Sequence, residues 1–318
     1  MHYYTVMATL PFKDTAFIDR EELARRWALA AEPCPDDARG PRWQLLLREF
    51  LWPLEPVRRA LGKPLEIAQA ARPKTVMLLP GFGAHPIRMR WMARKLEKAG
   101  HVTKKWGLGY NLGATEARFR QVEERLVDLY RRTGEPIHLV GWSLGGVMAR
   151  ELAKKHPDKV AKVITMGSPF SGSPRANNGG RAYQAIAGHR VDEPEIDTVL
   201  HEKPPVETVA FWSPKDGVVH PRAACGRAGE RDRAVALREP PGAQAERRQP
   251  EAIGGHHRQA HHVFPHRAIA HRIGARRTGG RHTAQRRIGA GIDGEEQSGI
   301  AQVFIQLLAR HTGLHAAI

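Results

Sequence analysis

Between residues 74 and 238 the chain alternates short apolar runs with stretches of helical periodicity. Thr75 to Pro80 is a continuous apolar run of the kind that forms a strand buried on both faces. Turn signals such as Gly100 and Gly134 separate the later segments. By the same pattern, further strands are expected near 101–108 and over 137–140, 160–166, 206–212 and 234–237.

Helices are expected between these strands. One fits Ile87 to Ala99, and another fits Leu144 to Lys155. A third should begin after Thr115, as its N-cap, and end at Gly134, with an apolar face spaced three and four residues apart. That face consists of Phe119, Val122, Leu126 and Leu129. Strands that alternate with helices predict an α/β fold with a mostly parallel sheet and helices on both faces.

The two ends of the chain differ from this middle part. Residues 1–73 contain a tryptophan-rich amphipathic stretch at 43–61, which predicts helices packed on the core, with a membrane-surface helix as the alternative. All lysines lie between Lys13 and Lys215, whereas the segment 239–318 is rich in Arg and His and has almost no apolar period. We therefore divide the chain into an N-terminal helical extension, a core at 74–238 and a poorly ordered tail.

Composition narrows the class of protein. The formal net charge is +17, yet charged residues make up an ordinary 26% of the chain. Cys34 and Cys225 are far apart and lack the spacing of a zinc site or a disulfide framework. Without an 18-residue apolar run or a signal peptide, we expect no membrane span and a cytoplasmic location. Non-specific nucleic-acid binding is the alternative that the basic charge raises, although no recognition motif accompanies it.

The motif that indicates chemistry is Gly141-Trp142-Ser143-Leu144-Gly145, which fits the nucleophile elbow G-x-S-x-G. It lies between a predicted strand and a predicted helix, as this motif requires. Such an abrupt turn strains the backbone of the serine and leaves no room for side chains two residues before and after it. The alternative is a glycine-rich strand-to-helix turn with an idle serine.

The sequence resembles the α/β-hydrolase superfamily, and within it the bacterial lipases and esterases, over roughly residues 75–238. The resemblance rests on PGFG after the first core strand, GWSLGG at the elbow, SPFSGSP after the next strand and WSPKDGVV after the strand that follows. It implies that Ser143 is the nucleophile and that the backbone N–H groups of Phe82 and Leu144 form the oxyanion hole. It also implies that Asp216 orients the catalytic histidine and that residues 168–205 form a cap. The plainer alternatives are that Asp216 is a turn residue without a catalytic role and that residues 168–205 form a solvated loop without a lid function.

The expected histidine is missing from its place. In the resembling proteins it follows one more short strand, but Ala234–Leu237 is followed by Arg238-Glu239-Pro240-Pro241-Gly242. Dropping one base from the codons of Glu-Pro-Pro-Gly-Ala permits Ser-His-Leu-Gly, so we suspect a change of reading frame near Arg238, although codon degeneracy permits many other readings. If the frame is intact, the histidines that first come into reach are His256, His257, His261 and His262, while His220 lies too close to Asp216.

These observations predict a serine hydrolase that cleaves small-molecule carboxylic esters through an acyl-enzyme intermediate. No metal or organic cofactor and no specific nucleic-acid partner are expected. Because the histidine is missing, a catalytically impaired protein of the same fold is a second hypothesis. An acyltransferase or a lactonase of this fold is a third.

Overall fold

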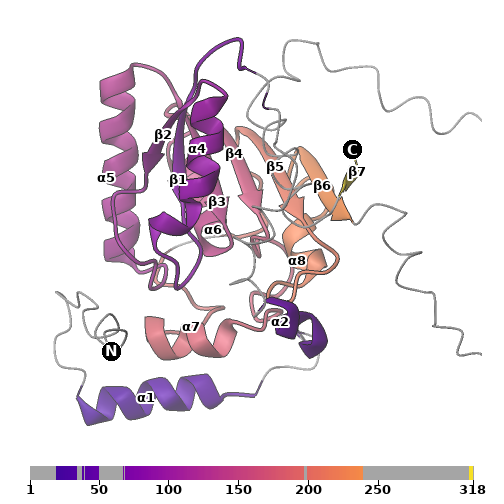
Figure 1. The fold of residues 1–318 in the computed structure, drawn as a ribbon. Coiled ribbons are helices and arrows are strands. Elements are labelled where there is room, and N and C mark those ends of the chain that lie inside the picture. Colours follow the sequence, from indigo (N-terminus) through magenta and orange to yellow (C-terminus); the bar gives the residue numbers. More distant parts are fainter. Residues whose placement is uncertain are drawn as a thin grey trace, which may run out of the picture.

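A seven-stranded sheet forms the centre of the protein, with helices on both of its sides (Figure 1). In the computed structural model the described residues are 19–33, 38, 40–49, 67, 69–196, 199–238 and 315–317. The strand order is β2-β1-β3-β4-β5-β6-β7. Strands β1 to β6 pair in parallel, and β7 pairs antiparallel with β6. The strands are β1 (Thr75–Leu79), β2 (Val102–Lys105), β3 (Ile137–Trp142), β4 (Val160–Met166), β5 (Glu207–Trp212), β6 (Arg233–Arg238) and β7 (His315–Ala317).

This arrangement confirms the predicted fold class. The helices are α1 (Arg20–Ala31), α2 (Trp43–Glu49), the 3-10 helix η3 (Pro86–Met89), α4 (Arg90–Lys98), α5 (Glu116–Thr133), α6 (Leu144–Lys155), α7 (Gly180–Ala187) and α8 (Pro221–Cys225). Helix α5 is capped as predicted, because the Thr115 side chain accepts from the Arg118 N–H and Gly134 adopts the left-handed conformation at the other end. The four residues of its predicted apolar face are all buried.

Two elements depart from their predicted form. The helix predicted from Ile87 to Ala99 is divided into η3 and α4. Pro86 starts η3, and the His85 side chain accepts from the Ile87 N–H, so this first turn is wound as a 3-10 helix. The strand predicted near 101–108 ends at Lys105, because the next residue, Trp106, turns into the core and its indole N–H donates to the Leu108 carbonyl at 2.7 Å.

The core consists of two apolar layers, one on each face of the sheet. Alternate residues of β1 divide between them: Val76 and Leu78 pack with α4, whereas Met77 and Leu79 pack with α5 and α6. A strand with one exposed face can be polar at every second position. Both faces of β1 are covered by apolar side chains, which explains the continuous apolar run in the sequence.

The N-terminal extension contacts the core at several places within the described residues. Helix α1 packs against α7 (Figure 1). The α2 backbone at Leu45 lies so close to the loop after β5 that a Cβ on Gly217 would come within 2.4 Å of it. Residues 1–18, 34–37, 39, 50–66, 68, 239–314 and 318 lie outside the described residues, so the division into extension, core and tail stays a prediction. No helix in the described ranges is long and apolar enough to cross a membrane.

Two histidines lie at the amino ends of the strands, His101 buried and His138 half-buried. The His138 Nδ1 and His101 Nε2 atoms are buried and have no hydrogen-bond partner among the described residues. Burial, reinforced by Lys162, Lys74 and His101, lowers the pKa of His138 to about 4. Burial also lowers the pKa of His101. The folded state therefore holds both imidazoles neutral at a pH where the unfolded chain binds protons.

We predict that the free energy of unfolding falls as the pH is lowered from about 6.5 towards 4. The His138 pKa is depressed in the folded state, so its contribution is complete above the unfolded pKa and is lost below it, by on the order of 2–3 kcal/mol. Urea titrations at several pH values measure this. His138→Leu should flatten the pH dependence in this window, and curves that stay parallel for the two proteins would contradict the assignment.

Candidate active site

Ser143 occupies a strained turn between β3 and α6. Its φ of 50° and ψ of −122° make it the one non-glycine residue with positive φ in the described ranges. Such a conformation costs a side-chain-bearing residue of the order of 1–3 kcal/mol. The Ser143 N–H donates to the Met166 carbonyl at 2.9 Å, so the turn is tied to the end of β4. The backbone thus has the geometry of a nucleophile elbow.

Three glycines let the first turn of α6 pack directly on the strands. A Cβ on Gly141 would lie 2.3 Å from the Gly146 backbone, and one on Gly145 would lie 2.3 Å from the Leu79 carbonyl oxygen. A Cβ on Gly146 would lie 2.0 Å from the Ser168 hydroxyl. Because two of these obstacles are main-chain atoms, no change of rotamer could relieve them.

The loop after β1 lies against Ser143. A Cβ on Gly81 would come within 3.2 Å of the Ser143 Cβ, and the next residue in this loop is Phe82. Among the hydrogen bonds of the described residues, none uses the N–H of Phe82 or of Leu144 as its donor. Leu144 also begins α6, where the helix dipole favours negative charge.

Asp216 follows β5 in a turn that fixes its carboxylate. The Oδ1 atom accepts from the N–H groups of Val218 and Val219 at 2.8 and 2.9 Å. The Oδ2 atom lies 2.9 Å from the place of a Cβ on Gly167, a glycine with a φ of +55°. The preceding residue, Met166, accepts a hydrogen bond from the Ser143 N–H through its carbonyl. The end of β4 therefore lies between Ser143 and the Asp216 carboxylate.

The structure therefore brings four predicted residues to one edge of the sheet. Phe82, Ser143, Leu144 and Asp216 follow the carboxyl ends of β1, β3 and β5, where β1 and β3 are neighbours and β4 lies between β3 and β5. This edge is where ligands bind in open α/β sheets.

No histidine side chain within the described ranges hydrogen-bonds the Ser143 hydroxyl. His220 caps α8 instead, where its Nδ1 accepts from the Arg222 N–H at 3.2 Å. The predicted alternatives His256, His257, His261 and His262 lie outside the described residues. Nor does any group of three or more His, Cys, Asp or Glu side chains in the described part of the chain form a cluster that could hold a metal ion.

Helix α7 forms the centre of the predicted cap segment 168–205 and contacts the loop after β1. The Tyr183 ring packs on the Phe82 ring, with centroids 5.1 Å apart. The Tyr183 hydroxyl accepts from the Ala114 N–H at 3.3 Å. Burial raises the pKa of Tyr183 to about 12, so the phenol stays neutral. The sequence analysis did not single out this tyrosine.

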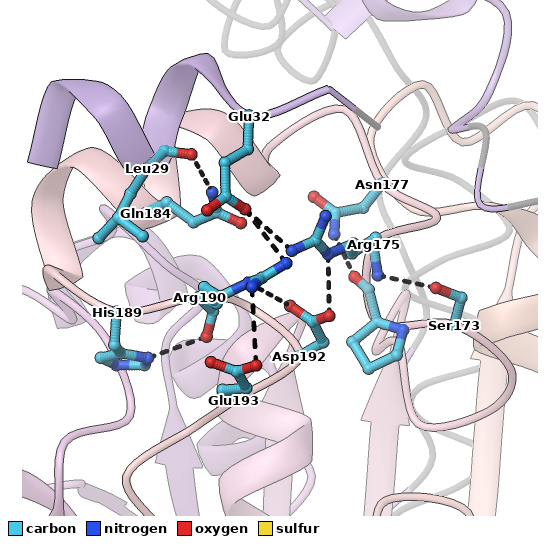
Figure 2. Close-up of polar contacts among 11 residues, drawn as sticks. Leu29, Glu32, Ser173, Arg175, Asn177, Gln184, His189, Arg190, Asp192 and Glu193 are labelled. Atoms are coloured by element: carbon cyan, nitrogen blue, oxygen red, sulfur yellow. Dashed lines mark hydrogen bonds and ion pairs between the residues drawn. The ribbon is translucent and has the colours of Figure 1, made fainter. Parts of the chain in front are cut away.

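Charged side chains hold this segment together and join it to α1, as Figure 2 shows. Arg175 contacts Glu32 at 3.1 Å and Asp192 at 2.9 Å, and Arg190 contacts Glu32 at 3.3 Å. The Gln184 side chain donates to the Leu29 carbonyl. These contacts join the residues before and after α7 to the end of α1. Ion pairs therefore hold the segment 168–205 against the N-terminal extension.

A further residue that the sequence analysis did not single out is Asn111, in the loop after β2. Its side chain is fully buried, and its Nδ2 donates to the Pro80 carbonyl at 2.8 Å. In the sequence it lies in the glycine-rich stretch GLGYNLG, whose composition indicates only a loop. Nothing in that pattern shows which carbonyl the amide meets.

Comparison with known proteins agrees with this arrangement. The family model described as the alpha/beta hydrolase fold matches residues 79–185, from the end of β1 into α7. The sheet order and the elbow, together with this match over about a third of the chain, show the α/β-hydrolase fold.

Curated relatives match over short stretches. The chain is 37% identical over 62 residues, 20% of its length, to the biotin biosynthesis bifunctional protein BioHC of Teredinibacter turnerae. It is 41% identical over 54 residues, 17% of its length, to the pimeloyl-[acyl-carrier protein] methyl ester esterase of Aeromonas hydrophila. The matches span 10% and 21% of those proteins' own length.

Among solved structures, the chain is similar to a monoacylglycerol lipase of Paleococcus ferrophilus, with 16% identity and a TM-score of 0.36. It is also similar to the lipase BlEst2 of Bacillus licheniformis, with 15% identity and a TM-score of 0.39. Each comparison covers 54% of this chain and 87% of the other.

The packing at the elbow predicts that Gly145→Ala destabilises the protein. Alanine is favoured over glycine inside a helix by about 1 kcal/mol, but here the added methyl group would meet the Leu79 carbonyl at 2.3 Å. We expect the clash to dominate, with a net loss of about 2–3 kcal/mol. The matched control is Gly109→Ala, where nothing lies within 4 Å of the added Cβ. Urea midpoints compare the two, and equal midpoints would contradict the close approach.

Proposed function

We propose that this protein is a serine hydrolase that cleaves carboxylic esters through an acyl-enzyme intermediate. The observation that carries the proposal is the strained Ser143 at the carboxyl edge of the sheet, flanked by the N–H groups of Phe82 and Leu144, which bind no other described group. An acyl-transfer intermediate needs two such pre-aimed donors for its oxyanion. The hydrolase fold supports the reaction class.

In this proposal Ser143 attacks the ester carbonyl, and its proton passes to a histidine that Asp216 orients. Asp216 suits this role because two backbone N–H groups fix Oδ1, and Oδ2 faces the end of β4. These hydrogen bonds favour the charged carboxylate that would stabilise an imidazolium. Since the negative oxygen of the intermediate would receive the Phe82 and Leu144 N–H groups, the barrier falls at the step where charge develops.

Ester substrates fit the side chains around the serine. Phe82, Trp142 and Leu144 are apolar and each is partly accessible to solvent. Such a lining favours short or medium acyl chains over charged substrates. One of the matched relatives is by name a methyl ester esterase, which supports the same class of bond.

The nucleophile can be tested directly. A fluorophosphonate probe should label Ser143, and Ser143→Ala should abolish both labelling and hydrolysis of p-nitrophenyl esters, because this hydroxyl forms the covalent bond. Ser173→Ala is the matched control in the cap segment and should keep both. In a chain that supplies the histidine, Asp216→Asn should lower kcat by up to about 10⁴-fold. Labelling that persists in Ser143→Ala would refute the proposal.

The source of the catalytic base gives a second prediction. If the reading frame changes near Arg238, the chain as written is a poor esterase, which keeps only the contribution of the oxyanion hole and binding, about 10³ to 10⁴ over water. Deleting or inserting one base near codon 238, to open the Ser-His-Leu-Gly frame, should then raise kcat by orders of magnitude.

Truncation provides the control for that experiment. A chain that ends at Arg238 should keep whatever ester hydrolysis the full chain has. A robust activity that disappears on this truncation, or on substitution of His256, His257, His261 or His262, would show that the tail supplies the base and that the frame is intact.

A further inference from the structure

Asn111 is fully buried, and both polar atoms of its side-chain amide form hydrogen bonds. The Nδ2 atom donates to the Pro80 carbonyl at 2.8 Å, and the Oδ1 atom accepts from the Gly113 N–H at 3.3 Å. The asparagine amide supplies the donor and the acceptor on separate atoms, so it can bind both groups at once. Pro80 is the first residue of the loop that carries Phe82.

The backbone of Asn111 binds the other end of the same loop. Its carbonyl accepts from the Gly83 N–H at 2.7 Å, and its N–H donates to the Ala84 carbonyl at 3.1 Å. The three bonds at Pro80, Gly83 and Ala84 enclose Gly81 and Phe82. These bonds therefore restrain the peptide groups on both sides of Phe82.

The restrained loop has a close neighbour on its other side. A Cβ on Gly145 would lie 2.6 Å from the Pro80 carbonyl oxygen, and one on Gly81 would lie 3.2 Å from the Ser143 Cβ. The Pro80 carbonyl thus lies between the Asn111 amide and the first turn of α6. A rotation of this peptide group would alter the path of the chain to Phe82 and with it the direction of the Phe82 N–H.

Residues of the predicted cap segment hold the part of the chain that follows Asn111. Tyr183 accepts from the Ala114 N–H, and its hydroxyl lies 3.2 Å from the His189 Nε2. The His189 Nδ1 lies 3.0 Å from the Arg190 carbonyl, which requires a proton on Nδ1 and leaves Nε2 to accept from the tyrosine. This chain of hydrogen bonds fixes the segment after Asn111, so that Asn111 serves as a rigid support.

We propose that Asn111 is a positioning residue for the oxyanion hole, which sets the direction of the Phe82 N–H through the Pro80 carbonyl. The inference rests on the proposed ester hydrolysis. It gives the loop after β2 a role in turnover as well as in packing. The Asn111 amide does not contact the substrate; it holds the loop after β1, whose Phe82 N–H would donate to the intermediate. Loss of this support should affect the charged intermediate more than the bound ester.

Two substitutions isolate the effect. Asn111→Leu removes both side-chain hydrogen bonds, and Asn111→Asp keeps an acceptor for Gly113 but removes the donor to Pro80. We expect each to lower kcat by about 10- to 100-fold, the scale of a misplaced catalytic group, with KM changed by less than about 3-fold. The matched control is Thr208→Val, which removes buried hydrogen bonds with Asp232 at the opposite edge of the sheet and should leave kcat unchanged.

Hydrogen exchange of the amides at 81–84 supplies a measurement that does not depend on turnover. Their exchange should be at least about 10-fold faster in Asn111→Leu than in the wild type and unchanged in Thr208→Val, because a looser loop opens more often. A folded Asn111→Leu variant with wild-type kcat, or with unchanged exchange at 81–84, overturns the inference. If neither the wild type nor the frame-restored variant shows Ser143-dependent turnover, the proposed function is refuted instead, and the exchange result then decides the role of Asn111 in holding the loop.

Discussion

The contact on which the site depends is the direct packing of the first turn of α6 against the ends of β1 and β3. A Cβ on Gly145 would lie 2.3 Å from the Leu79 carbonyl oxygen, and a Cβ on Gly141 would lie 2.3 Å from the Gly146 backbone. Only glycine permits backbone to meet backbone at such distances. With the helix held this close to the sheet, the single connecting residue, Ser143, is forced to positive φ. The strain at the serine is therefore a consequence of the packing beside it.

The same close approach places the other elements of the candidate site. Because α6 lies on the Pro80 carbonyl, the loop after β1 has little room to move, and Asn111 occupies its remaining side. Asp216 is held independently, by two N–H groups of its own turn and by a glycine at the end of β4. Contacts with main-chain atoms thus fix both the loop after β1 and the Asp216 carboxylate.

The segment around α7 is held by a different kind of interaction. Ion pairs of Arg175 and Arg190 with Glu32 and Asp192 join it to the end of α1 (Figure 2). Exposed or half-exposed ion pairs contribute little singly, but a network with shared partners orients its members. The apolar part of the contact is the stacking of Tyr183 on Phe82, which connects the segment to the loop that we assign to the oxyanion hole.

The sequence by itself determined the alternation of strands and helices, because residues 75–238 carry both periods clearly and caps such as Thr115 and Gly134 act locally. It also determined the elbow, whose glycines and serine are adjacent in the chain. Tertiary structure alone decided the contacts of Asn111 and Tyr183 with the loop after β1, because their partners lie tens to a hundred residues away. The division of one predicted helix into η3 and α4 and the early end of β2 have local causes, the cap at His85 and the bond of Trp106 to Leu108, which the apolar period did not indicate. A hydrogen bond from an amide to a distant carbonyl leaves no period and no spacing in the sequence, so only the folded arrangement of the strands could show it.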